Sequence, residues 1–452
     1  MTSEVAARGG GKRIGRRLLI GVLGLALVAG GGGVTVYGLT LYSASEPHRG
    51  SLALQGGTVL AGPDLQPLEG ATVLVTDGVI TAVGPDAEVE LPAGAEVVDV
   101  SGHTVLPGLI DLHVHLGSPE LAAGEQMAWW RWPERVADTI RFVPGTRRAL
   151  LESGVTSVRS LGDDHAWVIE MRSLLRDGEL EGPRLFTAGP LFTTHNGHPV
   201  VTLGADPTSD AVRLPGSTGQ ARQMVRALAA GPDPVDLIKV VQERGSADRP
   251  LQPLDPAVLR AVVEEAHAHG RPVVAHWGSL ADLEDVLAAG VDGLEHLEAR
   301  ELLDGWPDAT LQALLDRGVP LSPTLAVTEV ALPEEPHRAL RQRAAEYAAA
   351  GGTLVAGSDA GMPGVPFGGG LHRELELLVG AGLSPQDVLQ AATVRAATVL
   401  RTDRIGVVAP GRAADLLVVD GAPHHDIRAI RQVALVLRDG RTVADHRAEP
   451  GS

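Results

Sequence analysis

The sequence has no cysteine and almost no lysine. Without cysteine, the 452-residue chain cannot form disulfides, thiolate zinc sites, iron–sulfur clusters, a cysteine nucleophile or a lipoprotein cysteine anchor. Lysine occurs only at Lys12 and Lys239, so arginine supplies the rest of the 38 basic side chains. Aromatic residues are also scarce, at 3% of the chain. A lysine in the body of such a chain calls for a chemical explanation.

Acidic side chains outnumber basic ones. The 56 Asp and Glu residues give a formal net charge of −18. Proteins that bind nucleic acid through phosphate contacts are normally basic, so we expect no nucleic-acid partner. Hydrophobic residues make up 44% of the chain, which is enough for a large core. At about 100–200 residues per domain, the length predicts two to four structural units.

The N-terminus reads as a membrane-directing segment. Residues 1–17 form a basic flank, and residues 18–45 carry no charge. The apolar stretch 18–42 is long enough to cross a bilayer at about 20 residues per span. Positive flanking charges favour a cytoplasmic N-terminus, so we expect a single-pass protein of the cell membrane with its catalytic domain outside the cytoplasm. The alternative is a cleaved signal segment and a secreted protein.

The rest of the chain divides by its hydrophobic pattern. Residues 51–106 contain short apolar runs broken by Gly and Asp, which predict β-strands with tight turns. Residues 107–400 alternate short apolar runs with helical stretches about eight times, which predicts an α/β fold, a closed (β/α)8 TIM-type barrel. Residues 401–446 return to the β pattern. We expect the two flanking β segments to build one small domain.

A pair of histidines lies in the first apolar run of the barrel region. His113 and His115 are two residues apart in "LPGLIDLHVHLG", so in a strand both rings point to the same face. Two imidazoles on one face form half of a site for zinc or a similar ion. His267 and His269 have the same spacing in "EEAHAHG", but a helical pattern there separates their rings, and we interpret them as surface residues.

Three later strands end in residues that also bind metals. His276 ends "RPVVAH", His296 ends "VDGLEH" and Asp359 ends "GTLVAGSD". Active sites of barrels of this type lie at the C-terminal ends of the strands. Any one of these side chains could have a purely structural role, but together with the histidine pair they predict a metal centre.

Lys239 lies in the middle of an apolar run, "VDLIKVV". A charged ammonium is costly to bury, and the structural explanation would be an ion pair with Asp236 or Glu243. A buried lysine can instead lose its proton and act as a nucleophile or a base. The neutral amine can also add CO2 to form a carbamate, whose two oxygens can bridge two metal ions.

Two further features lie near the expected site. Arg159, in "SVRSLGD", could contact a substrate carboxylate or pair with Asp163, and we favour the pair. Trp129, Trp130 and Trp132 form a cluster just after the first barrel strand. They are candidates for an aromatic wall or lid over the site, and equally for packing in the core or in an interface.

These motifs resemble the metal-dependent amidohydrolase superfamily over roughly residues 51–446, and in particular its imidazolonepropionase-like and zinc prolidase-like members. The resemblance is carried by segments that occur in the same order along the chain: "VLPGLIDLHVHL", "GVTSVRSLG", "GPRLFTAG", "DLIKVV", "VVAHW", "GLEHL", "LVAGSDAG", "FGGGLHRELELLVGAGLSPQDVLQAATVRAA" and "GVVAPGRAADLLVVDGAP".

The resemblance implies a centre of two divalent ions, zinc in the first instance, at six positions. His113, His115 and Asp359 would hold one ion, His276 and His296 the other, and carboxylated Lys239 would bridge them. A hydroxide shared by the ions would attack the substrate carbonyl. Asp359 would take the proton and pass it to the leaving amine.

Substrate contacts follow less directly. In prolidase-like members a histidine in a Gly-His pair faces the substrate, which points to His198 in "TTHNGHP", with His195 as the second candidate. Some relatives also use a tyrosine from a loop over the site. The only tyrosine after residue 42 is Tyr347, in an Ala-rich helical stretch, so that contact does not carry over.

We therefore expect a hydrolase of C–N bonds in small linear amides such as dipeptides. The main alternative is a hydrolase of cyclic amides, imidazolone- or hydantoin-like, or of lactones. A non-catalytic surface-anchored binding protein is a third interpretation, but all six metal positions are filled. Relatives often assemble as oligomers, so a homo-oligomer is a further expectation.

Overall fold

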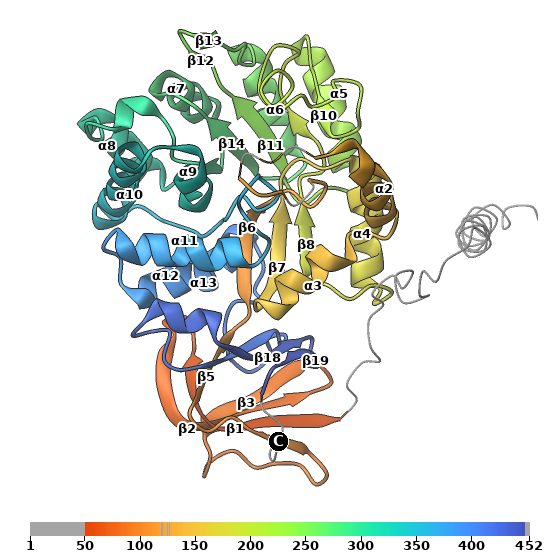
Figure 1. Ribbon diagram of the computed structural model, residues 1–452, viewed down its shortest axis with the longest axis vertical. Helices are drawn as coiled ribbons and strands as arrows, with labels where there is room; N and C mark the ends of the chain where they lie inside the picture. Colours follow the sequence, from red (N-terminus) through yellow and green to blue (C-terminus); the bar gives the residue numbers. More distant parts are fainter. Residues whose placement is uncertain (1–49, 119–120, 124, 126, 448–452) are drawn as a thin grey trace, which may run out of the picture.

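The structure is a computed structural model that describes residues 50–118, 121–123, 125 and 127–447. Figure 1 shows two parts, a β-sheet at one end of the molecule and a larger α/β part above it. Strands at the start and at the end of the described chain lie together in the sheet, while the α/β part is made from the chain between them.

The terminal sheet joins the two ends of the chain through one strand pair. β5 and β17 run antiparallel, with Val105 opposite Val418, and both of these side chains are buried in the core of the sheet. The order is β19-β18-β17-β5-β1-β2-β3, and β4 also pairs with β1. The strands are β1 (Ser51–Ala61), β2 (Gln66–Thr76), β3 (Val79–Pro85), β4 (Glu96–Asp99), β5 (His103–Pro107), β17 (Leu416–Asp420), β18 (Val433–Arg438) and β19 (Arg441–Asp445).

The α/β part contains a ring of parallel strands. Asp236 N donates to Thr187 O at 2.9 Å between β8 and β11, and parallel bridges at Leu354 and Ala360 connect β16 back to β6. Apart from β8, the ring strands are fully buried, as parallel strands covered on both faces are. They are β6 (Leu109–Val114), β7 (Val155–Ser160), β8 (Arg184–Thr187), β11 (Ile238–Gln242), β14 (Val273–Trp277), β15 (Gly293–Glu295) and β16 (Leu321–Ser322).

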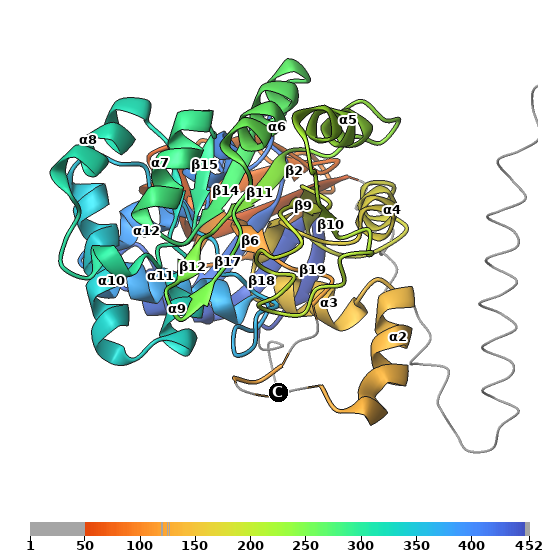
Figure 2. The ribbon, with the colours of Figure 1, turned by 90° about the horizontal axis from the view of Figure 1, so that it is seen from above.

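Helices surround the ring, as Figure 2 shows from above. They are α2 (Trp132–Ile140), α3 (Pro144–Glu152), α4 (His165–Arg176), α5 (Thr218–Ala229), α6 (Pro256–Ala268), α7 (Leu280–Ala289), α8 (Asp308–Arg317), α9 (Leu325–Ala331), α10 (Glu334–Ala349), α11 (Gly369–Gly380), α12 (Pro385–Ala391) and α13 (Val394–Val399). Short elements are β9 (Leu191–Phe192), β10 (Val212–Arg213), β12 (Gly245–Ser246), β13 (Arg249–Pro250), η2 (Trp129–Arg131), η3 (Arg300–Leu302) and η4 (Ile427–Arg431).

Local sequence signals set the helix limits. The Asp255 side chain accepts from Ala257 N and Val258 N at the start of α6, with Pro256 in the first turn, which is a favourable N-cap. Gly290 ends α7 in a left-handed conformation, with φ of 87°. These signals set where α6 begins and where the chain leaves α7 for β15.

The membrane part of the predicted fold class requires correction. In the part of the chain that the structure describes, no helix has the length and apolar character needed to cross a bilayer. The predicted segment 18–42 and its basic flank lie outside the described residues. The expected single-pass location in the cell membrane is therefore not supported, whereas the α/β fold is observed.

A buried ion pair fastens the ring of strands to the terminal sheet. Arg184, at the start of β8, contacts Asp415 at 2.7 Å, just before β17. The Asp415 side chain is 2% exposed, and it also accepts from Asp439 N at 2.7 Å. Arg184 makes a second ion pair with Asp439. One carboxylate therefore fixes both a strand of the ring and a turn of the sheet.

Replacing Asp415 with Ala should lower the free energy of unfolding by about 2 kcal/mol, because removing one partner leaves a largely buried guanidinium and a backbone N–H with fewer acceptors. Urea unfolding followed by circular dichroism measures the change. Asp420→Ala, at the exposed end of β17, is the matched control and should leave the midpoint unchanged. Equal midpoints for both variants would contradict the role given to Asp415.

Candidate metal centre and active site

The residues predicted to hold the first metal ion come from β6 and from the segment around Asp359, which lies beside β6 where the ring of strands closes. The His113 and His115 rings lie 5.2 Å apart, centroid to centroid. Their Nε2 atoms lie 3.5 and 3.1 Å from Asp359 Oδ1. One ligand atom from each of the three residues lies within 4.8 Å of the others, a spacing at which a single cation could contact all three.

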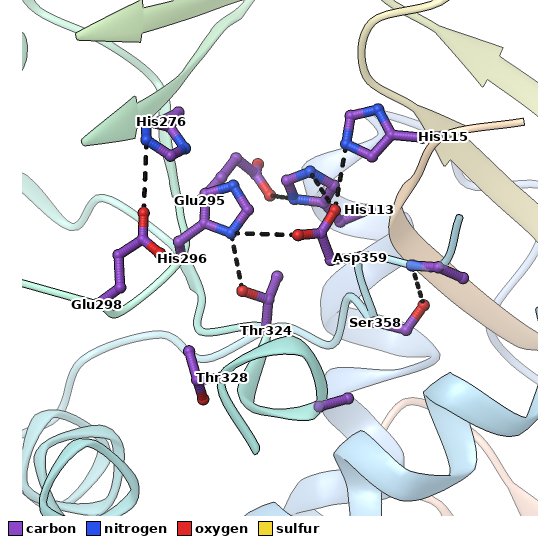
Figure 3. A network of polar contacts seen from close by, with 12 residues as sticks. His113, His115, His276, Glu295, His296, Glu298, Thr324, Thr328, Ser358 and Asp359 are labelled. Atoms are coloured by element: carbon purple, nitrogen blue, oxygen red, sulfur yellow. Dashed lines mark hydrogen bonds and ion pairs between the residues drawn. The ribbon is translucent and has the colours of Figure 1, made fainter. Parts of the chain in front are cut away.

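His276 and His296 extend this cluster from the ends of β14 and β15. The His296 ring lies 4.6 Å from the His113 ring and 4.7 Å from the His276 ring, and its Nδ1 is 3.8 Å from Asp359 Oδ2. Figure 3 shows the His113, His115 and His296 imidazoles around the Asp359 carboxylate, with His276 farther away beside Glu298. The structure thus brings together the five His and Asp side chains expected at the site.

Backbone strain marks the same place. His296, Thr324 and Asp359 have φ of 72°, 50° and 62°, in the left-handed region that residues with a side chain seldom adopt. The Thr324 hydroxyl lies 2.9 Å from His296 Nδ1. Because such conformations cost energy, the surrounding contacts hold these residues where their side chains meet.

Electrostatics favour neutral imidazoles around an ionised carboxylate. Burial, with a smaller effect of Lys239, lowers the pKa of His113 far below its usual value, and burial with the neighbouring His113 does the same for His296. Burial alone would raise the pKa of Asp359, but His113 and His115 outweigh it and lower the pKa to about 2. His113 and His296 therefore keep lone pairs available for a cation.

Lys239 lies inside the ring beneath this cluster. Its side chain is 2% exposed, and Nζ has no hydrogen-bond partner in the described part of the chain. Burial lowers its pKa to about 8, and the attraction of Glu295 and Asp359 limits the shift. The alternative ion pairs are not formed, because Asp236 pairs with Arg172 at 2.7 Å and Glu243 with His276 at 3.2 Å.

These unpartnered atoms test whether the residues suit a metal. His113 Nε2 is also buried without a hydrogen-bond partner among the described residues. A buried polar atom without a partner is costly, and a cation bound between the histidines and Asp359 would remove that cost. The donor set of imidazole nitrogen and carboxylate oxygen is the one that zinc and similar ions take in catalytic sites.

Glu295 orients a metal-ligand candidate and was not anticipated from the sequence. Its Oε2 lies 2.9 Å from His113 Nδ1, so it fixes which imidazole nitrogen faces the cluster. Arg159 donates to its other carboxylate oxygen. The only sequence signal for Glu295 was its position next to His296 in an apolar run.

Asp111 was missed in the same way. Its carboxylate accepts from Ser358 N at 2.9 Å and from Ser358 Oγ at 2.6 Å, and burial raises its pKa to about 6. It joins the strand of His113 to the segment of Asp359. Its position two residues before His113 in a buried strand was the only sequence signal.

The predicted Arg159–Asp163 pair is wrong. Arg159 is 2% exposed, donates to Leu112 O at 2.6 Å and pairs with Glu295. Asp163 accepts instead from Ser160 Oγ and from Gly117 N. Arg159 lines a cavity of about 820 Å³ at the N-terminal ends of the strands, opposite the metal cluster. It does not line the cavity over the metal cluster.

The cavity over the metal cluster has a volume of about 780 Å³. His198 lines it, and its ring stacks on that of His276 at 4.8 Å with an angle of 9° between the planes. Burial and His276 lower the pKa of His198 to about 3, and its Nδ1 lies 2.6 Å from Thr202 Oγ1. His195 is exposed and does not line this cavity.

The tryptophan cluster does not form a wall of this cavity. Trp129, Trp130 and Trp132 are 78%, 67% and 57% exposed on η2 and α2, and none of them lines the cavity. They are not core residues either. His267 contacts Asp292 at 2.7 Å with 43% of its side chain exposed, in line with the surface position expected for it.

Replacing Glu295 with Gln should weaken zinc binding by about 10- to 100-fold, because His113 loses the carboxylate that orients it. Competition with a chromophoric chelator measures the affinity, and circular dichroism checks the fold. Glu301→Gln, at an exposed position on η3, is the control with the same chemical change. If both variants bind zinc as the parent does, Glu295 has no part in holding the ligand.

Known proteins share this architecture along most of the chain. Ochratoxinase of Aspergillus niger is 24% identical over 434 residues, covering 87% of this chain and 86% of that protein. Imidazolonepropionase of Symbiobacterium thermophilum is 26% identical, covering 84% and 92%. The crystal structure of a putative prolidase from Bifidobacterium longum is 29% identical with a TM-score of 0.71, covering 89% and 97%.

A family model gives the assignment. The model of the amidohydrolase family matches residues 104–443, from the last strand before the ring to the end of the terminal sheet. This range contains every residue of the cluster around Asp359. The chain belongs to the amidohydrolase family and is a metal-binding hydrolase of carbon–nitrogen bonds.

Proposed function

We propose that the protein hydrolyses linear amides of the dipeptide type with two zinc ions. The observation that carries this proposal is the group of four histidines and Asp359 above Lys239, all but His115 buried, at the floor of a cavity of about 780 Å³. Similar solved structures include a prolidase complexed with N-methylphosphonate-L-proline, 26% identical with a TM-score of 0.69. That likeness supports a linear amide as the first substrate to test.

The metal ligands would be shared between two ions. His113, His115 and Asp359 would hold one ion, and His276 with His296 the other. When bound, such ions lower the pKa of water toward 7 and polarise the substrate carbonyl. Asp359 is ionised and lies at the centre of the histidines, so its carboxylate would accept the proton of the attacking water and return it to the leaving amine.

Lys239 would complete the centre as a carbamate. Its amine nitrogen bonds to the carbon of CO2, the N–H proton leaves to solvent, and the product carries two oxygens and one negative charge. A lowered pKa supplies neutral amine near pH 8, and the unpartnered Nζ leaves it accessible to CO2 within the fold. An arginine cannot easily react in this way, which agrees with the use of lysine at this position.

His198 would face the substrate from the cavity wall. Its ring is held by Thr202 and stacked on His276, and its pKa of about 3 keeps it neutral at physiological pH. A neutral imidazole in this place can donate or accept one hydrogen bond to a substrate amide or carbonyl. Arg159 and His195 have no substrate contact in this proposal.

A cyclic amide or lactone is the second candidate substrate. Imidazolonepropionase and the enamidase of Eubacterium barkeri, 26% identical, are among the relatives of similar length. The same metal ligands would serve either substrate class, because the attack on the carbonyl is the same.

A substrate screen separates these two candidates. Zinc-reconstituted protein is assayed against a dipeptide library, a set of lactams and hydantoins, and a set of lactones. We expect turnover of dipeptides and none of comparable rate with the ring compounds. Turnover confined to the ring compounds would sink the dipeptide proposal and leave the metal centre standing.

Lys239→Arg should lose most of the activity and one of two bound metal ions, because a guanidinium cannot form the carbamate. Elemental analysis gives the metal content, and circular dichroism checks folding. Lys239→Ala provides a second route: added propionate should restore part of its activity by supplying the missing carboxylate. Full activity in Lys239→Arg, or no difference in metal content, would disprove the carbamate.

A further inference from the structure

The cavity of about 820 Å³ at the N-terminal ends of the strands has no role in the proposed mechanism. Its walls are the turns that lead into β11, β14, β15 and β16, together with the chain around the end of α13. None of the described residues that line it also lines the catalytic cavity. It is therefore a second, separate space in which a ligand could bind.

The charge of this cavity is strongly one-sided. Among its described lining residues only Asp236 and Asp292 are acidic, whereas the basic ones are Arg159, Arg271, Arg317, Arg395 and Arg401. Because the whole chain has a net charge of −18, the excess of positive charge is a local property of the cavity. Neighbouring guanidinium groups repel one another, and an anion bound among them would relieve that repulsion.

The two acidic residues have partners that limit how far they neutralise the arginines. Asp236 pairs with Arg172 at 2.7 Å, and Arg172 does not line the cavity. Asp292 is shared between His267 at 2.7 Å and Arg401 at 3.1 Å. Among the described residues, Arg401 is thus the only arginine of the cavity that pairs with either acid.

Arg271 and Arg317 keep donors without an acceptor. Arg271 Nε is buried, and it has no hydrogen-bond partner in the described part of the chain. Arg317 is the last residue of α8, and its side chain is exposed. Neither arginine forms an ion pair with a described residue, whereas Arg395 is held by Asp387 at 3.0 Å. These two side chains can therefore bind an incoming anion without first losing another partner.

Arg159 adds a positive charge deeper in the same cavity. Its side chain is 2% exposed, its Nε donates to Leu112 O at 2.6 Å, and its Nη2 donates to Glu295. Its remaining nitrogen, Nη1, has no hydrogen-bond partner among the described residues. Since Arg159 is buried and Arg317 is exposed, positive charge extends from the solvent side of the cavity to its interior.

Between the charges the lining is apolar. Val274 and Val291 are buried, and Phe186 and Leu400 are half-buried. Cavities of about 300–1,000 Å³ with apolar walls and a few polar groups are typical of sites for small organic ligands. A ligand that suits this cavity therefore combines an apolar body with negative charge.

We propose that this cavity binds a small organic anion that carries at least two negative charges, as a phosphate ester or a dicarboxylate, on an apolar body. Arg271 and Arg317 bind one charged group through charge-assisted hydrogen bonds, and Arg159 presents a further donor deeper in the cavity. Phe186 and Val274 contact the apolar body. The site is separate from the metal centre, so it does not depend on which amide the protein hydrolyses.

The first experiment measures binding by calorimetric titration of the full-length, zinc-loaded protein. The probes are phenyl phosphate and phthalate, with inorganic phosphate and neutral benzamide for comparison. Both organic dianions should bind, phenyl phosphate more tightly than inorganic phosphate because of its ring, and benzamide not measurably. The tighter of the two dianions identifies phosphate or carboxylate as the preferred group. Added sodium chloride should weaken binding of both, because it screens the attraction.

Variants then locate the site. Arg271→Met and Arg317→Met should each weaken phenyl phosphate binding about 10-fold, as expected for the loss of a charge-assisted hydrogen bond, and Arg271→Lys should recover part of the loss. Arg260→Met, at an exposed position on α6 outside this cavity, is the matched control and should bind as the parent does. No binding by the parent, or equal affinity in all three methionine variants, would overturn the proposal.

Chemical protection tests the same site without any substitution. Phenylglyoxal modifies accessible arginines, and mass spectrometry of the digested protein gives the rate at each position. Phenyl phosphate should slow the modification of Arg271 and Arg317 in proportion to its occupancy, and leave Arg260 and Arg338 unchanged. Equal rates at Arg271 and Arg317 with and without the ligand would place any bound anion elsewhere, for example at the metal centre, and would refute the proposed site.

Discussion

The active end of the fold depends on one carboxylate surrounded by imidazoles in a place that water hardly reaches. Asp359 lies close to His113, His115 and His296. Burial lowers the pKa of His113 and of His296, which keeps both imidazoles neutral. Among the described residues, His113 Nε2 and Asp359 Oδ1 are buried without a hydrogen-bond partner, and a cation bound between them would remove that cost. The strained backbone at Asp359 and His296, the buried Glu295 and the buried amine of Lys239 are arranged around that requirement.

Much of this could be predicted from the sequence because the chemistry lies at strand ends. The strand carrying His113 and His115 shows its histidines in an apolar alternation, and His276, His296 and Asp359 each follow a short apolar run, so topology alone places them at one end of the ring. Lys239 stood out because Lys12 is the only other lysine in the sequence. The pattern of residues along the chain therefore identifies the floor of the cavity.

The residues that orient the metal ligands could not be predicted, because their roles depend on contacts across the ring of strands. Arg159 was assigned to the nearest acid in sequence, Asp163, but it pairs with Glu295, which is 136 residues away. The exposed tryptophans show the converse: a rare residue type near a site need not belong to it.

The metal site lies where the ring of strands closes, so a bound ion would also stabilise the fold. Asp111 and Ser358, joined by two hydrogen bonds, are 247 residues apart, and the ligands His113 and Asp359 lie beside them on the first and last segments of the ring. An ion held there is a reversible cross-link that closes a very long loop, and loop closure of that length restricts the unfolded chain strongly. Removing the ion would then weaken the junction between β6 and the segment of Asp359, one of the two places where the ring of strands closes.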